Sequence, residues 1–131
     1  MILNLTQHPA TAEQVAVGVQ DLPNSETLRK LLTFDRLPNR IEIENRAKAL
    51  ALMADAAGAD AAMIGGAPFL MSKLEAELLN RGIRPMYAFS KRVVTETKNF
   101  DGTVTKTSTF AHEGFIMVRY SGPDIEVGEL A

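Results

Sequence analysis

Residues 59–90 read ADAAMIGGAPFLMSKLEAELLNRGIRPMYAFS, and this stretch decides the fold of the chain. The apolar run over 59–64 ends in a glycine pair, which predicts a buried strand followed by a tight loop. The apolar spacing over 69–80 predicts a helix, and the proline just before it suits a first helical turn. Residues 84–90 alternate toward a second buried strand. Because strand, helix and strand follow one another, we expect a right-handed parallel crossover.

The chain before this stretch supplies one more strand and three helices. Thr11 is a typical helix N-cap, and Val15 and Val19 are expected to pack on one side of the helix that it starts. Gly58 ends the longest helix, whose apolar residues recur at helical spacing. The expected elements are a strand over 1–5 and helices over 11–18, 25–32 and 40–57.

The chain after this stretch changes to an antiparallel character. Residues 93–98 and 104–110 are rich in threonine and valine, and the Asn-Phe-Asp-Gly sequence between them is a hairpin-turn signal. One more strand is expected over 115–120, whereas 121–131 is acidic, contains a proline and is expected to be a loose tail. We therefore expect a single Rossmann-like α/β domain over 1–120, with a parallel core sheet and a C-terminal antiparallel hairpin extension.

The composition narrows the classes of function. A length of 131 residues with 46% apolar and 23% charged residues fits one domain with its own core. The absence of cysteine excludes disulfides and thiolate metal sites, and we expect neither a metal nor a cofactor. A net charge of -2 argues against duplex nucleic acid as a partner. Without an apolar run that could span a bilayer or a signal-peptide pattern, we expect no membrane association and a cytoplasmic location.

Three polar clusters follow the three expected strands of the parallel core. In an open parallel sheet, ligands bind beyond the carboxyl ends of the strands, where the loops converge. The clusters are therefore expected to meet in one candidate site. In chain order they are Thr6-Gln7-His8, Gly65-Gly66-Ala67-Pro68 and Ser90-Lys91-Arg92.

The residue types in these clusters suit a phosphate-bearing ligand. A glycine pair before a helix lets the backbone and the helix dipole approach a phosphate, although the same pair also makes a plain tight turn. Lys91 and Arg92 supply an ammonium and a planar guanidinium, which a solvated charged pair would also explain. His8 and His112 flank strand ends, where each can move a proton or satisfy a local carbonyl. Lys106 either edges the same pocket or protects an exposed strand edge.

Four blocks of this sequence give a resemblance to a known family. Two are specific, because a Tyr-Ala-x-x-Lys-Arg strand end followed by a Lys-x-Ser-x-Phe-x-His strand is not expected from composition alone. The chain resembles the small CRISPR-associated ring nucleases, distant relatives of the CARF sensor domain, over nearly its whole length. The blocks are Leu3-Asn4-Leu5-Thr6-Gln7-His8 with Glu13-Gln14, Ile64-Gly65-Gly66, Pro85-Met86-Tyr87-Ala88-Phe89-Ser90-Lys91-Arg92, and Lys106 with Ser108, Phe110 and His112.

The resemblance implies a CARF-like domain that cleaves cyclic oligoadenylate messengers and so switches off CRISPR-type signalling. It further implies a homodimer that holds a two-fold symmetric ring across its interface and cleaves it without a metal. Ring opening can use the ribose 2′-hydroxyl as an internal nucleophile, so the protein need only orient it and stabilise charge on the phosphoryl oxygens. The implied catalytic residues are Lys91, Arg92, His8 and Ser90. The implied ligand-binding residues are Thr6, Gln7, Gly65, Gly66, Ala67, Phe69, Lys106 and His112.

Three other functions fit the same residues. A sensor or sponge would hold the cyclic nucleotide without cutting it. An unrelated Rossmann-like protein would act on a phosphosugar or a mononucleotide and would show no preference for a symmetric ring. A structural subunit would use the exposed hairpin to pair with a strand of a partner. A test for turnover distinguishes the sensor or sponge from a nuclease. A test for anion binding distinguishes the structural subunit from the ligand-binding functions.

Overall fold

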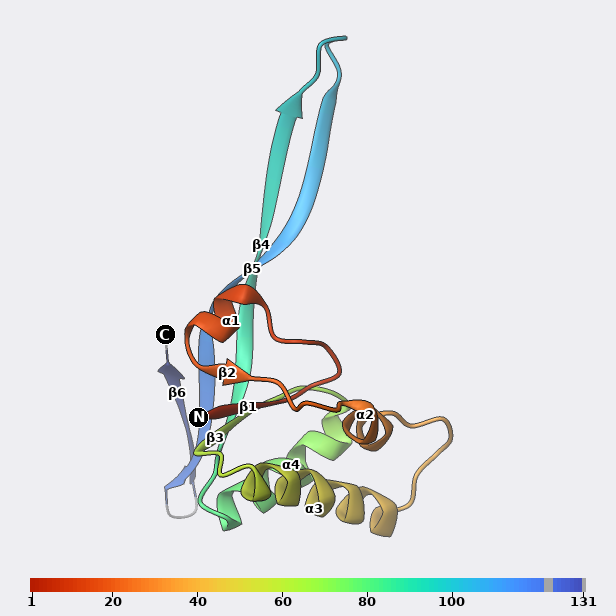
Figure 1. Ribbon diagram of the computed structural model, residues 1–131, viewed down its shortest axis with the longest axis vertical. Coiled ribbons are helices and arrows are strands. Elements are labelled where there is room, and N and C mark those ends of the chain that lie inside the picture. Colours follow the sequence, from red (N-terminus) through yellow and green to blue (C-terminus); the bar gives the residue numbers. More distant parts are fainter. Residues whose placement is uncertain (122–123, 131) are drawn as a thin grey trace.

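The computed structural model describes the backbone of residues 1–121 and 124–130 and the side chains of residues 1–118. It contains a six-stranded sheet in the order β2-β1-β3-β4-β5-β6 (Figure 1). The pairings among β2, β1, β3 and β4 are parallel, and β5 and β6 are added antiparallel. The strands are β1 (Ile2–Leu5), β2 (Val19–Gln20), β3 (Ala61–Ile64), β4 (Arg84–Lys98), β5 (Val104–Ser121) and β6 (Asp124–Leu130).

This arrangement confirms a mixed α/β fold with a parallel core and a C-terminal antiparallel hairpin. The expected crossover is also present, because β3 and β4 pair in parallel with α4 between them. None of the helices in the described residues is long and apolar enough to cross a membrane. The helices are α1 (Ala12–Ala16), α2 (Glu26–Leu32), α3 (Arg40–Ala56) and α4 (Pro68–Asn80).

The two faces of the sheet are covered by different helices (Figure 1). On one face, side chains of α2, α3 and α4 pack against Leu3, Leu5 and Ile64 in the larger core. On the other face a smaller core joins Val19, Met63 and other residues of the sheet beneath α1. Side chains alternate between the two faces along each strand. Any polar strand residue on the face of this smaller core therefore lies on the same side of the sheet as α1.

At the starts of α1 and α3, side-chain hydrogen bonds of the N-cap residues replace missing helical partners. The Asn39 side chain accepts a hydrogen bond from the Glu42 amide at 2.8 Å and starts α3. Thr11 and Gln14 form a capping box at α1, in which each side chain accepts a hydrogen bond from the other's amide. α4 begins with Pro68, whose ring is compatible with a first turn.

Four expectations about the elements are wrong. The first helix ends at Ala16, and Val15 is exposed rather than packed. Val19 instead belongs to β2, a two-residue strand that is too short to leave a sequence pattern. β4 does not end at Ser90, and 104–110 and 115–120 form one strand, β5. Residues 124–130, expected in a loose tail, form β6 and pair with β5.

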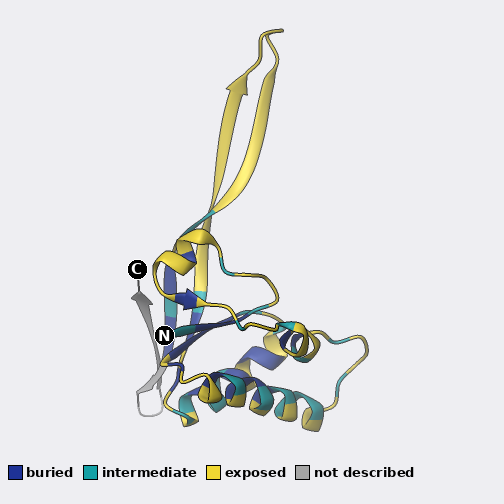
Figure 2. Ribbon diagram, viewed as in Figure 1, coloured by how far each residue is buried: buried dark blue, intermediate teal, exposed yellow. Residues whose placement is uncertain are grey.

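The continuous β4 and β5 carry a two-stranded extension away from the body, which we call the arm (residues 90–112). The pairing register shifts between Phe89 and Ser90, where the arm begins. The turn is closed by a hydrogen bond from the Asn99 amide to the Thr103 carbonyl at 2.8 Å, and Gly102 adopts a φ of 86° that favours glycine. The hairpin turn expected at this place is therefore confirmed. Almost every residue of the arm is exposed (Figure 2).

Candidate functional site

A pocket of about 370 Å³ lies where the carboxyl ends of β1 and β3 meet β4 at Tyr87 and Ala88, just before the arm begins. His8 and Thr6 from the loop after β1 and Gly65 from the loop after β3 line it together, as expected for parallel strand ends. α1 contributes residues from the other side. The complete lining is Thr6, His8, Pro9, Thr11, Gln14, Met63, Ile64, Gly65, Tyr87 and Ala88.

Asn4 determines the shape of the loop that carries His8. This side chain is only 3% exposed, and its amide nitrogen donates to the His8 carbonyl and to the Asp21 carboxylate, both at 2.8 Å. Its carbonyl oxygen accepts hydrogen bonds from the Thr6 amide at 2.9 Å and the Thr6 hydroxyl at 2.7 Å. With donors and acceptors both paired, the hydrogen bonds of this buried group offset its desolvation cost while they fix the loop.

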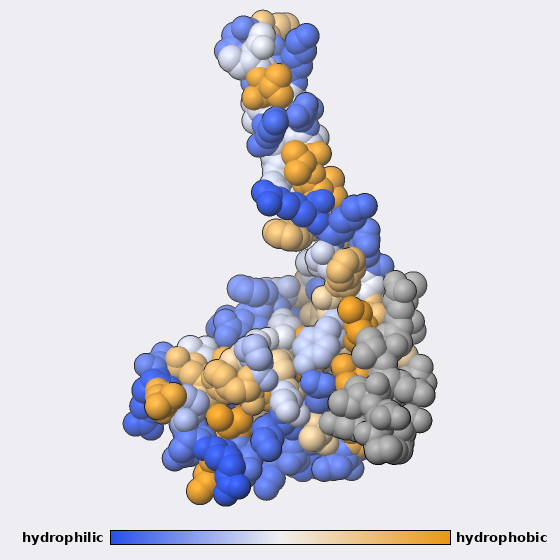
Figure 3. All heavy atoms as spheres, turned by 180° about the vertical axis from the view of Figure 1, so that it is seen from behind, coloured by the Kyte–Doolittle hydropathy of each residue, from blue (hydrophilic) through white to orange (hydrophobic). Residues whose placement is uncertain are grey.

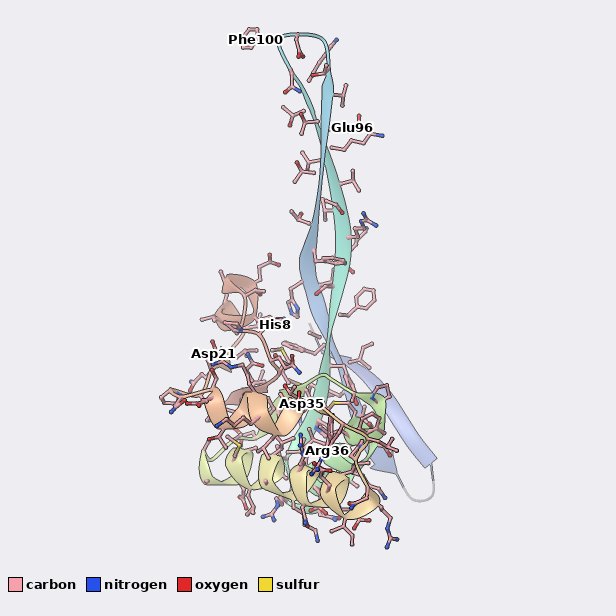
Figure 4. All side chains as sticks on the ribbon, turned by 90° about the vertical axis from the view of Figure 1, so that its right-hand side faces the viewer. His8, Asp21, Asp35, Arg36, Glu96 and Phe100 are labelled. Carbon is pink, nitrogen blue, oxygen red and sulfur yellow. The ribbon has the colours of Figure 1, made fainter. Side chains whose placement is uncertain are left out.

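Asp21 ties the same loop to the chain after β2. Besides Asn4, its carboxylate accepts a hydrogen bond from the Ala10 amide at 3.0 Å. Figure 4 shows His8 and Asp21 close to each other beneath α1. The loop backbone is thus held at both ends, while the His8 side chain is exposed and lines the pocket.

Ser90 and His112 form the first cross-strand pair of the arm, next to Ala88 in the pocket wall. The His112 ring lies 4.7 Å from the ring of Phe115, which belongs to the core on the α1 side. His112 Nδ1 is buried and has no hydrogen-bond partner among the described residues. A buried polar atom without a partner costs free energy, so this nitrogen needs a hydrogen-bond partner that the described residues do not supply.

The two cations at the base of the arm point to opposite faces. Side chains alternate along β4, and Met86 belongs to the core on the α1 side, so Ser90 and Arg92 share that side whereas Lys91 faces away. Arg92 Nε donates to the Ser108 hydroxyl at 2.5 Å. Of the two predicted cations, only Arg92 therefore lies on the pocket's side of the sheet.

Lys106 lies far along the arm. It pairs across the strands with Glu96, and its ammonium is 3.6 Å from that carboxylate. Glu96 is separated from Ser90 by about 20 Å of extended strand. Lys106 is therefore remote from the pocket of its own chain, although the family resemblance implied a ligand contact.

The residues of the loop after β3 lie partly on the pocket side of the sheet and partly on the opposite side. Gly65 lines the pocket, but a side chain at Gly66 would meet Met71 at 3.4 Å in the other core. The Ala67 carbonyl accepts hydrogen bonds from the first turn of α4, and Phe69 packs edge-on against Phe34 with ring centres 5.0 Å apart. The structure thus brings Gly65 to the pocket but not Gly66, Ala67 or Phe69.

Gln7 points to a different place from its neighbours. Its side-chain amide donates to the Leu32 carbonyl at 3.3 Å, at the end of α2. It lines a smaller cavity of about 100 Å³ beside Asp21 and Arg29. Within the described residues there is no group of three histidine, aspartate or glutamate side chains that could hold a metal ion.

Tyr87 connects the pocket wall to α4 and provides a pH-dependent signal. Its hydroxyl donates to the Glu75 carboxylate at 3.0 Å. Burial, and then the negative charge of Glu75, raise the pKa of Tyr87 above the ordinary value of about 10. A raised pKa in the folded state stabilises the protein below the unfolded pKa, and this stabilisation is lost as the pH rises through the folded pKa.

We therefore expect Tyr87 to ionise at a higher pH in the folded protein than in urea. The chain has two tyrosines and no tryptophan, so the Tyr120→Phe variant leaves Tyr87 as the only phenol that absorbs at 295 nm. The measurement is an alkaline titration of this variant, folded and unfolded. Equal midpoints would contradict the contact with Glu75.

Asn4, Asp21 and Gln14 are the site residues that the sequence analysis did not identify as such. The available signal was a single polar residue, Asn4, inside an otherwise apolar strand. Gln14 gave a second signal, because it is a buried polar residue of α1 and lines the pocket. Asp21 left no local pattern, since its partners lie 11 and 17 residues away.

The chain was compared with protein families, curated proteins and solved structures. A family model described as the uncharacterized protein MJ1673 family matches residues 1–116. No curated protein and no solved structure matches the chain.

Proposed function

We propose that this chain, which belongs to the uncharacterized MJ1673 family, binds cyclic oligoadenylate in the pocket at the base of the arm and cleaves it. The observation that carries the proposal is His112 Nδ1, a buried atom that has no partner among the described residues. His112 pairs with Ser90, two residues after Ala88 in the wall of the pocket that His8 lines, although His112 itself is not among the lining residues. Two imidazoles and a hydroxyl on one face suit proton transfer at a phosphodiester.

The pocket supports a nucleotide as the ligand. Its volume of about 370 Å³ is in the range of small-molecule sites, and its wall combines the apolar Met63, Ile64 and Ala88 with a few polar groups. Its position beyond the carboxyl ends of β1 and β3 is where Rossmann-like sheets bind ligands. The parallel core with helices on both faces supports a Rossmann-like, CARF-like domain, which we include in the proposal.

The proposed reaction is an internal transfer at phosphorus. The ribose 2′-oxygen forms a bond to the adjacent phosphorus, the bond to the 5′-oxygen breaks, and the products are a 2′,3′-cyclic phosphate and a 5′-hydroxyl. One histidine takes the proton of the 2′-hydroxyl, and the other returns a proton to the departing 5′-oxygen. Neither water nor a metal is consumed, so atoms and charges balance within the ring and the two imidazoles.

The other residues have binding roles in this proposal. Arg92 stabilises the charge on the phosphoryl oxygens, and Ser90 and Gly65 orient the phosphate. Thr6 contacts the ring from the opposite wall. A symmetric ring has two equivalent halves, so we also propose that the protein acts as a homodimer. Ring messengers of this class act inside the cell, which would place the protein in the cytoplasm.

Arg92 and Lys91 offer a matched pair for testing the proposal, because substitution of either residue by alanine removes one positive charge, in each case from a different face of β4. We expect Arg92→Ala to slow ring cleavage by about 10²- to 10³-fold, as for the loss of one stabilising donor, and Lys91→Ala to change it little. The assay uses labelled cyclic tri-, tetra- and hexa-adenylate in EDTA and resolves bound from cleaved ring.

The outcomes of this assay separate the competing functions. A 2′,3′-cyclic phosphate product that is lost in Arg92→Ala supports the nuclease. Binding without cleavage in the wild type replaces it with a sensor or sponge. Neither binding nor cleavage refutes the proposed ligand, and equal losses in the two variants refute the assignment of Arg92.

A further inference from the structure

The arm exposes apolar side chains that the described residues of its own chain do not cover. Phe110 is 75% exposed and Val94 57%, and Phe100 stands at the tip (Figure 4). In the space-filling view, apolar residues interrupt the polar surface along the arm (Figure 3). A two-stranded ribbon is marginally stable in water unless a third element covers one face. The arm therefore has the composition of a surface that is covered in the functional assembly.

The two faces of the arm differ in character. One face continues from His112 and combines large apolar residues with cations, whereas the opposite face, apart from Val93, carries mainly threonine. The bond from Arg92 to Ser108 and the ion pair between Lys106 and Glu96 place these four side chains on the first face. We call it the His112 face, and it contains Arg92, Val94, Glu96 and Lys98 of β4 and Val104, Lys106, Ser108 and Phe110 of β5.

A complementary apolar surface lies on α1 of the same chain. Val15 is 55% exposed and Val17 44%, and Ala12 and Ala16 are also exposed, whereas Gln14 faces the interior. α1 and its C-cap Val17 thus present mostly apolar side chains outward, beside the exposed Glu13, which is unusual for a surface helix. It lies beside the base of the arm (Figure 1), but the arm leads away from it, so the outer part of the His112 face can reach an α1 only in another molecule.

Charge favours a second copy as that molecule. Residues 91–110 hold four of the 14 lysine and arginine residues and two of the 16 carboxylates, so the rest of the chain carries four more negative than positive charges. A positive arm on a negative body is complementary between identical chains. An arrangement in which each arm covers the other chain's α1 is also self-complementary, as a two-fold dimer requires.

We propose that the His112 face of the arm docks on α1 of a second copy, and that the second arm docks reciprocally on the first chain. Phe110 and Val94 pack against Val15 and Val17 of the partner chain. The inference rests on the arm and α1 alone, and it stands whichever ligand the pocket takes.

Cysteine cross-linking tests this contact directly, because the natural chain has no cysteine. A Phe110→Cys chain and a differently tagged Val15→Cys chain are mixed and oxidised without nucleotide. A disulfide needs the two Cβ atoms within about 4.5 Å, so it reports contact rather than chance collision. We expect a mixed disulfide dimer. Thr109→Cys, one residue away on the opposite face, and Leu52→Cys, exposed on α3, are the matched controls and should cross-link much less.

Sedimentation of the uncross-linked protein provides the second measurement. We expect the wild type to sediment as a dimer, the double variant Val94→Asp with Phe110→Asp as a folded monomer, and the double variant Thr107→Asp with Thr109→Asp as a dimer. A monomeric wild type, a dimer that survives the first pair of substitutions, or control disulfides as abundant as the tested one would each overturn the proposal. No nucleotide enters either experiment, so failure here leaves the proposed ligand and its cleavage untouched, and a monomeric wild type would overturn only the homodimer in the proposed function.

Discussion

His112→Phe is expected to slow ring cleavage by about 10²- to 10⁴-fold, the usual contribution of a general acid or base. Phenylalanine is similar in size and keeps the packing against Phe115, whose ring lies 4.7 Å from the imidazole. It also removes the buried Nδ1, which has no partner among the residues whose side chains are described. Because an apolar group of the same shape avoids that desolvation cost, the free energy of unfolding should stay the same or rise.

This combination of effects distinguishes function from structure. If His112 only filled space, its replacement would lower the stability of the protein without a selective loss of turnover. The measurements are single-turnover cleavage in EDTA and urea unfolding, made on the same preparations. His8→Ala should slow cleavage to a similar extent. Because the two residues act in one reaction, the double variant should lose much less rate than the product of the two single losses. Full activity in His112→Phe would contradict the assignment.

Asn4→Ala is expected to lower the free energy of unfolding by roughly 2–4 kcal/mol, since it leaves several buried groups without partners. Four hydrogen bonds are lost, two to Thr6 and one each to His8 and Asp21. The loop that carries His8 then loses its fixed shape. We also expect ring binding to weaken by at least about tenfold, a coupling of about 1.4 kcal/mol.

Asp21→Asn is the matched control for this prediction. The substitution keeps an oxygen that can accept hydrogen bonds from Asn4 and from the Ala10 amide, which now donate to the Asp21 carboxylate. Its effect on stability should stay below about 1 kcal/mol. Urea unfolding and equilibrium ring binding are measured for both variants. If Asn4→Ala binds the ring as tightly as the wild type, the network does not shape the site.

The crossover was predictable because its apolar residues are buried on both sides of the sheet. β3 and α4 lie within two residues of their predicted bounds, and β4 begins at Arg84 as predicted. The arm was not predictable as two continuous strands. It is exposed on both faces, so no apolar alternation marks it, and Ser90-Lys91-Arg92 looked like a strand end.

The candidate site was predicted in part, and the reason lies in which face each residue occupies. The rule for parallel strand ends correctly brought Thr6, His8 and Gly65 together. It carried no information on side-chain direction, which separates Arg92 from Lys91. The two-residue strand β2 and the long-range hydrogen bonds of Asp21 depend on contacts between distant parts of the chain, and no local sequence pattern reveals such contacts.

The most direct test of the account uses the chain's two histidines, His8 and His112, as reporters of one ligand site. Their ring signals are followed by NMR in histidine-labelled protein during titration with cyclic tri-, tetra- and hexa-adenylate in EDTA, and each signal is assigned with a His→Gln variant. We expect one ring size to shift both signals with the same midpoint. Binding that shifts neither or only one of them, or no binding at all, would contradict the claim that the pocket and the base of the arm form one nucleotide site.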